Sequence, residues 1–242
     1  MLNTINKLKR KIKFFQLSLS STTKHLKKDI TIPKRWLGND YGGFYVATEF
    51  LDKNSIVYSF GIGEDISFDE EIIKDNNCLV FGFDPTPKSI NWIKSRQVHE
   101  NFRFYSSGIG NKTAIDYFYL PKNPNYVSGS LVQQNNVDSD IKIEVQLQSL
   151  QDIAHMLKHK KIDVLKMDIE GFEYNVIESI LNSDVEIGQI LVEVHERFFE
   201  NGQQRTIDML EKLRKHDFLI FGISETFEEI SLINKNLINN KK

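Results

Sequence analysis

Short apolar runs alternate along most of the chain with segments whose apolar residues recur at helical spacing. The runs predict buried strands, because a strand covered on both faces reads as a continuous hydrophobic stretch. Strands are predicted over 55–63, 78–87, 101–110, 162–171 and 187–196, and helices over 65–75, 88–97, 149–161, 172–181 and 203–217. This alternation predicts right-handed βαβ units, and therefore a mainly parallel sheet with helices on both faces.

Other segments break this alternation. Residues 113–121 and 141–148 read as β segments, and 218–224 and 228–234 as a terminal hairpin that makes the last strand antiparallel. The polar stretch 122–140 between the β segments is long for a connection, which favours a lid, a substrate loop or local disorder. Three glycines within 35–46 predict a turn-rich entry into the fold.

Length and composition are those of one globular domain. The 242 residues are 40% hydrophobic, and no window approaches the roughly 18–20 apolar residues of a membrane span. The lysine-rich N-terminus lacks the apolar core of a secretory signal. Cys78 is the only cysteine, so neither an intrachain disulfide nor a cysteine-based zinc site is expected. Together these features favour the cytoplasm.

Charge divides the chain at about residue 35. Residues 1–35 hold ten basic residues and one acid, a net +9, and the other 21 basic and 32 acidic residues leave −11 for 36–242. The acidic body argues against nucleic-acid binding. The basic N-terminal extension interleaves apolar residues with Lys and Arg. It therefore suits an anionic membrane surface or a protein partner, and equally a solvated helical extension.

Three features at predicted strand ends point to a nucleoside cofactor, although each also fits a plain turn or a helix cap. Gly61 and Gly63 follow the first strand and let the backbone approach a ligand, but Ile66 stands where the dinucleotide fingerprint needs a third glycine. Asp84 ends the second strand 23 residues after Gly61, where an acid reaches ribose hydroxyls. The turn 107–110 ends the third strand and is placed to line an adenine.

Charged residues mark the ends of the next two strands. The end of the predicted strand 162–171 carries a charge at every second position, Lys166, Asp168 and Glu170, which would share one face. The predicted strand 187–196 places Glu193 and His195 on one face. If the strands are neighbours, a histidine suited to general-base work meets acids that can hold a cationic cofactor, a hydroxyl or a metal. A structural ion-pair network is the alternative. Acidic surroundings suit a sulfonium better than a pyrophosphate, which favours S-adenosylmethionine over NAD.

At this point the sequence resembles the FkbM-type family of S-adenosylmethionine-dependent methyltransferases over roughly 36–200. "IDVLKMDIEGFEYNVIESI" (162–180) is similar to that family's D-x-L-K-x-D-x-E-G-x-E signature. The stretches "YGGFYV", "VYSFGIGEDISFD", "VFGFDPTP" and "ILVEVHE" fit in order and spacing. The resemblance implies a class I methyltransferase (Rossmann-like) fold over 36–242, with seven strands, the last antiparallel, and helices on both faces.

The resemblance also implies roles by position. The cofactor-binding set is Tyr41, Gly42, Gly61, Gly63, Glu64, Asp65, Asp84, Ser107, Gly108, Ile109 and Asp168. Within it Asp84 would hold the ribose, 107–109 would lie near the adenine, and Tyr41 and Gly42 would close over the methionine end. Asp168, Glu170 and His195 would face the methyl group and the acceptor. The first strand has Tyr58 and Ser59 where many class I enzymes place an acid, so the methionine amino group needs another partner, for which Asp168 is our candidate.

We therefore expect O-methylation of a sugar hydroxyl on a glycan or glycolipid precursor, as in polysaccharide biosynthesis. His195 would act as base, while Asp168 and Glu170 position the acceptor or a divalent cation. Two alternatives stay open, an NAD-dependent oxidoreductase and a non-catalytic cofactor-binding module. The sequence lacks the third glycine and any Tyr-x-x-x-Lys pair expected of the oxidoreductase. The presence of Asp168, Glu170 and His195 argues against the non-catalytic module.

Overall fold

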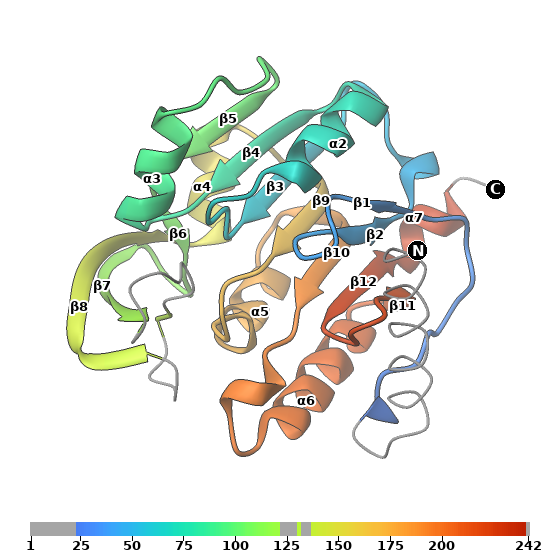
Figure 1. The fold of residues 1–242 in the computed structure, drawn as a ribbon. Coiled ribbons are helices and arrows are strands. Elements are labelled where there is room, and N and C mark those ends of the chain that lie inside the picture. Colours follow the sequence, from blue (N-terminus) through green and yellow to red (C-terminus); the bar gives the residue numbers. More distant parts are fainter. Residues whose placement is uncertain (1–22, 122–129, 132–136, 241–242) are drawn as a thin grey trace, which may run out of the picture.

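The computed structural model of the chain describes residues 23–121, 130–131 and 137–240. Most of the basic extension (1–22) and most of the polar stretch (122–129 and 132–136) lie outside the described residues. A seven-stranded sheet forms the centre, in the order β11-β12-β10-β9-β3-β4-β5 (Figure 1). Its strands are β3 (Ile56–Phe60), β4 (Leu79–Phe83), β5 (Phe102–Tyr105), β9 (Lys161–Met167), β10 (Glu186–Glu193), β11 (Phe218–Ile223) and β12 (Glu229–Asn234).

Strand direction confirms the predicted class I methyltransferase arrangement. Strands β5, β4, β3, β9 and β10 pair in parallel, whereas β12 pairs antiparallel with both β10 and β11. The order of the strands reverses between β3 and β9, whose pairing runs from Val57 opposite Val164 to Phe60 opposite Met167. Ligands of open α/β sheets bind beyond the carboxyl ends of the strands at such a reversal.

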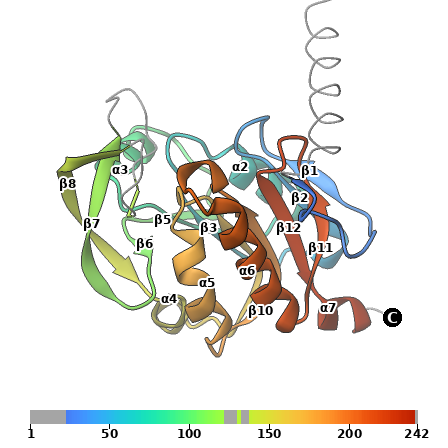
Figure 2. The ribbon, with the colours of Figure 1, turned by 90° about the horizontal axis from the view of Figure 1, so that it is seen from below.

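Helices cover both faces of the sheet (Figure 2). They are α2 (Ser67–Asn76), α3 (Pro87–Lys94), α4 (Leu150–Leu157), α5 (Glu173–Leu181), α6 (Gly202–Lys215) and α7 (Lys235–Asn239), with 3-10 turns η2 (Thr48–Phe50) and η3 (Glu196–Phe198). One core cluster joins α4, α5 and α6 to the sheet, and a second joins α2 and α3 to the opposite face. Among the described residues, no helix combines the length and the apolar character needed to cross a bilayer.

Two β hairpins lie outside the main sheet. The glycine-rich entry forms β1 (Arg35–Leu37) and β2 (Phe44–Val46), where the sequence predicted only turns. The second hairpin, β7 (Ala114–Pro121) and β8 (Val137–Gln148), forms a small sheet with β6 (Gly108–Ile109). Strand β8 begins inside the stretch predicted as a loop to residue 140. The loop prediction was wrong for residues 137–140, because β8 runs back to Val137, which pairs with Pro121 of β7, through polar residues that carry little strand signal.

The described part of the basic extension packs on the domain. Backbone N–H groups of Asp29 and Ile30 donate to the carbonyl of Ile220 in β11, and Ile220 N donates back to the Asp29 carboxylate at 2.9 Å. Arg214 also pairs with Asp29. The change of charge at residue 35 therefore does not coincide with the start of packing.

Candidate functional site

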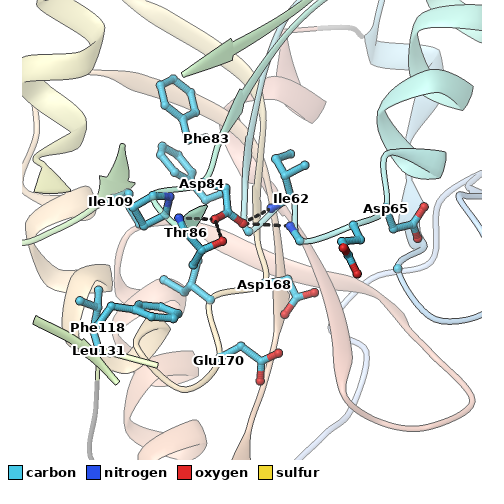
Figure 3. A pocket seen from close by; sticks show the side chains of 18 of the residues that line it. Ile62, Asp65, Phe83, Asp84, Thr86, Ile109, Phe118, Leu131, Asp168 and Glu170 are labelled. Atoms are coloured by element: carbon cyan, nitrogen blue, oxygen red, sulfur yellow. Dashed lines mark hydrogen bonds between the residues drawn. The ribbon is translucent and has the colours of Figure 1, made fainter. Parts of the chain in front are cut away.

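A cavity of about 420 Å³ opens at the carboxyl ends of the central strands (Figure 3). That volume lies within the range typical of small-molecule sites. Predicted site residues dominate its lining: Tyr41, Gly42, Gly61, Gly63, Glu64, Asp65, Asp84, Gly108, Ile109, Asp168 and Glu170. Two predicted residues, Ser107 and His195, do not line it. The Ser107 hydroxyl donates to Gln148 Oε1, and His195 lies buried beside Asp168 and Glu170.

Gly61 is required by a close approach between two backbone segments. It has a φ of +82°, and a Cβ atom at this position would lie 1.6 Å from the carbonyl oxygen of Asp168. Its own N–H donates to Phe83 O, and its carbonyl accepts from the buried Lys166 ammonium at 3.2 Å. The glycine loop is therefore fixed by β4 and β9 as well as by its own sequence.

Lys166 does not share a face with Asp168 and Glu170 as the two-residue alternation predicts. Strand β9 ends at Met167, and Glu170 adopts a left-handed φ of +55°. The Lys166 ammonium lies 5.7 Å from the ring centre of Phe44 in β2 and hydrogen-bonds to the glycine loop. The lysine thus supports the loop, and the predicted alternation stops before the two acids.

Asp84 ties the glycine loop to the start of α3. One carboxylate oxygen accepts from the N–H groups of Ile62 and Gly63, and the other from the N–H and hydroxyl of Thr86. Burial raises the pKa of Asp84, although these bonds oppose the shift. The side-chain cap of α3 is Thr86, so the alternative of Asp84 as helix cap is wrong. A ribose hydroxyl would have to take over one of these four bonds.

The β1–β2 turn forms one wall of the cavity. Asn39 Oδ1 accepts from the N–H groups of Tyr41 and Gly42, and Asn39 Nδ2 donates to Asp65 Oδ2 at 2.5 Å. The other Asp65 oxygen accepts from Ser67 N at the start of α2. Asp65 therefore joins the turn to the cofactor loop. Sequence reasoning missed Asn39, although an Asn that bonds to the backbone two residues on is a common turn signal.

The opposite wall is apolar. Ile109 of β6, Phe118 of β7 and Leu131 lie there together (Figure 3). The Ser130 hydroxyl donates to the carbonyl of Glu170 at 2.7 Å, which attaches this side to the acidic end. An apolar wall beside an acidic end suits a ligand with a flat base and a polar or cationic tail. Phe118 and Leu131 were not predicted, since they come from a second sheet and from a polar stretch.

Four carboxylates surround His195 at the acidic end. Its Nδ1 lies 3.0 Å from Glu173 Oε1, and its Nε2 lies 3.4 Å from Glu193, 3.5 Å from Glu170 and 3.8 Å from Asp168. The contact between Nδ1 and Glu173 is a hydrogen bond. Nε2 forms no hydrogen bond with any described residue, although three carboxylates lie within 3.8 Å of it. Strands β9 and β10 are neighbours, so the predicted convergence of two acids and a histidine occurs.

Glu173 is the residue of this cluster that sequence reasoning missed. It is fully buried in the first turn of α5 and also accepts from the N–H groups of Gly171 and His195. The helix dipole favours an acid in the first turn of any helix, so the sequence gives no separate signal for this contact. The sequence predicts that Glu193 shares a face with His195 but does not predict it as a site residue. In the structure its carboxylate lies 3.4 Å from His195 Nε2.

The cluster holds excess negative charge. Burial lowers the pKa of His195, but Glu173, Glu193 and Asp168 outweigh it and raise this pKa to about 10. Burial, then repulsion from Asp168, raises the pKa of Glu193 to about 9. The surrounding carboxylates therefore favour a positive charge at or beside His195. Its role as general base stays a prediction.

Comparison with known proteins gives one family. The sequence model of the family described as "Methyltransferase FkbM domain" matches residues 53–220. The human "Probable methyltransferase-like protein 24" is 28% identical over 188 residues, which cover 74% of this chain and 45% of the relative. The rat protein of the same name is 26% identical over 208 residues, covering 82% and 50%. This chain thus spans about half the length of these curated relatives.

Among solved structures, an rRNA methylase from Streptococcus thermophilus aligns with a TM-score of 0.44. The two chains are 13% identical, and the alignment covers 77% of this chain and 90% of that one.

Proposed function

Because the chain belongs to the FkbM methyltransferase family, we propose that it transfers a methyl group from S-adenosylmethionine to a hydroxyl of a carbohydrate acceptor. One observation carries the proposal. The cavity at the sheet's reversal point has an apolar wall for a base and ends in the carboxylates of Asp168 and Glu170. A cationic sulfonium is favoured at such an end, and an anionic pyrophosphate is not.

The residues present fit this donor. Gly61 and Gly63 let the backbone pass close to it, while Gly108, Ile109 and Phe118 border the space for a base. Tyr58 and Ser59 of β3 are fully buried and do not line the cavity. Asp168, which lines the cavity, therefore remains our candidate partner for the donor's amino group.

When bound, S-adenosylmethionine supplies a methyl carbon already activated by its sulfonium: the acceptor oxygen bonds to that carbon, the carbon–sulfur bond breaks, and the sulfur leaves as a neutral thioether. The protein's part is to align the acceptor, exclude water and take its proton. Asp168 and Glu170 reach the cavity with about a quarter of each side chain exposed, and one of them receives that proton. His195 lies behind them.

A sugar acceptor suits the open side of the cavity. Tyr41 exposes 89% of its surface at the mouth, so its ring is available to stack on a neutral ring-shaped ligand. The net charge of −11 over 36–242 disfavours polyanionic acceptors. We therefore place the acceptor among glycans or glycolipid precursors of polysaccharide biosynthesis.

Transfer of labelled methyl groups tests this proposal. The purified chain is incubated with methyl-labelled S-adenosylmethionine and a glycan and glycolipid extract. We expect label in the carbohydrate fraction that resists alkaline hydrolysis, because an ether survives base and a methyl ester does not. Excess S-adenosylhomocysteine should suppress incorporation. Label confined to protein, nucleic acid or alkali-labile esters would contradict the sugar-hydroxyl assignment.

A further inference from the structure

Three side chains at the acidic end of the cavity converge on one point. Asp168, Glu193 and His195 each place a potential ligand atom so that all three atoms lie within 4.8 Å of one another. Measured from His195 Nε2, the oxygens are 3.4 Å (Glu193 Oε1) and 3.8 Å (Asp168 Oδ1) away. Ligands about 2.0–2.2 Å from a shared cation lie roughly 3.0–3.5 Å apart. The observed spacings are therefore close to those of a cation site.

The histidine is oriented as a ligand. Its side chain is 1% exposed, and Nε2 has no hydrogen-bond partner among the described residues. Its other nitrogen, Nδ1, bonds to the fully buried Glu173, which also accepts from the backbone N–H of His195. An N–H at Nδ1 directed to a carboxylate leaves the Nε2 lone pair facing the two acids. Metal-binding histidines are commonly held by this arrangement.

From this geometry we propose that Asp168, Glu193 and His195 bind a divalent first-row transition cation, with Glu173 positioning the histidine. Two carboxylates and one imidazole favour Mn²⁺ or Zn²⁺, whereas Mg²⁺ and Ca²⁺ favour sites made of oxygen alone. The three ligands leave coordination positions open. Asp168 lines the cavity while Glu193 and His195 are more deeply buried, so the open positions face the acceptor space.

The competing interpretation is a purely structural ion-pair network around a protonated imidazole. An imidazolium has two N–H donors, and buried donors of native proteins are nearly always hydrogen-bonded. In this cluster only the Nδ1 side is bonded, although three carboxylates stand within 3.8 Å of Nε2. Arg197 approaches Glu193 at 3.7 Å but is 46% exposed, which makes it a weak counter-charge. A cation bound among the acids would coordinate Nε2 and would also neutralise the negative charge of the carboxylates.

A cation here would change the expected division of work, and this part of the inference rests on the proposed methyl transfer. An acceptor hydroxyl bound to the cation becomes more acidic. Glu170 lies outside the ligand set and lines the cavity, so we assign the hydroxyl proton to its carboxylate. His195 would then be a ligand, because a coordinated Nε2 has no lone pair left to act as base.

Metal binding without any methyl donor tests the site separately from the proposed function. Calorimetric titration of the purified full chain with Mn²⁺, and separately with Zn²⁺, should give one site with a micromolar dissociation constant. Asp168→Asn and Glu193→Gln should each weaken binding at least 30-fold. Glu173→Gln should weaken it about 10- to 100-fold by releasing the histidine.

Glu229→Gln is the matched control. Glu229 is a buried acid of β12 that lies opposite Glu193 in the sheet, but its carboxylate accepts from the Thr226 hydroxyl and does not belong to the ligand set. This variant should keep the metal affinity within about threefold. If ligand variants fail to fold, electron spin-echo spectra of wild-type protein with Mn²⁺ should show one directly bound imidazole nitrogen. The proposal would be overturned if the protein bound neither metal with micromolar affinity. It would also be overturned if folded ligand variants kept the wild-type affinity, or if the spectra showed no coupling to a nitrogen.

Discussion

The Gly61→Ala variant should unfold at a temperature about 10 °C below that of the wild type and lose binding of S-adenosylhomocysteine. The new methyl group would lie 1.6 Å from the carbonyl oxygen of Asp168, and the φ of +82° is unfavourable for any L-residue. Relief requires the loops after β3 and β9 to separate, at a cost of about 3 kcal/mol or more. Thermal unfolding and calorimetry measure the two effects.

Gly63→Ala is the comparison for stability. Gly63 has a φ of +55°, in the range of 52–64° that Asn77, Lys158, Glu170, Asp217 and Phe227 adopt in this fold. We therefore expect a loss of only about 1 kcal/mol in its free energy of unfolding. Equal destabilisation by the two substitutions would show that contact with the Asp168 carbonyl does not determine the need for glycine at position 61.

The His195→Asn variant should lose turnover by about 10²- to 10³-fold while keeping its affinity for S-adenosylhomocysteine within about threefold. The asparagine amide nitrogen occupies the place of Nδ1 and can donate to Glu173, so the buried acid keeps a partner. The substitution removes Nε2, which the proposed cation site uses as a ligand and which His195 would also need if it acted as the general base. Initial rates and calorimetry on the same preparation separate the two quantities.

A second histidine provides the control for this variant. His155 lies exposed on α4, away from the cavity, and His155→Asn should leave turnover unchanged. Removing metal with a chelator then separates the two roles of His195. If His195 is a metal ligand, wild type and His195→Asn should have similar rates after chelation. If it is a base, the difference between their rates should persist. Wild-type turnover in His195→Asn would remove the residue from the reaction altogether.

Much of the fold is predictable from the sequence because its central strands are buried on both faces. Continuous apolar runs such as 78–83 leave little ambiguity about β4, and helical spacing predicts α5 and α6. Strand ends in turn place Gly61, Asp84 and Asp168 at one edge. The β1–β2 hairpin was less predictable, since each of its strands has only three residues, too few to show a periodicity.

The site was harder to predict where one residue type satisfies two explanations. Glu173 fits the first turn of any helix, and only the structure shows its carboxylate against His195. Lys166 fits the alternation of charges in sequence, yet the strand ends one residue later and the lysine turns to the Gly61 carbonyl. Asp84 stays the predicted ribose partner, and only the structure shows that its carboxylate also accepts hydrogen bonds from Gly63 N–H and from the Thr86 hydroxyl. In each case the side chain contacts a segment distant in the sequence, and the local sequence pattern does not reveal that contact.

Calorimetric titration with S-adenosylhomocysteine tests most directly whether the cavity is a methyl-donor site. We expect one bound molecule per chain with a dissociation constant of about 1–100 μM, no heat from NAD, and at least tenfold weaker binding to Asp84→Ala. Binding of NAD in place of S-adenosylhomocysteine, or no binding of either by folded protein, would contradict the assignment of this cavity to a methyl donor.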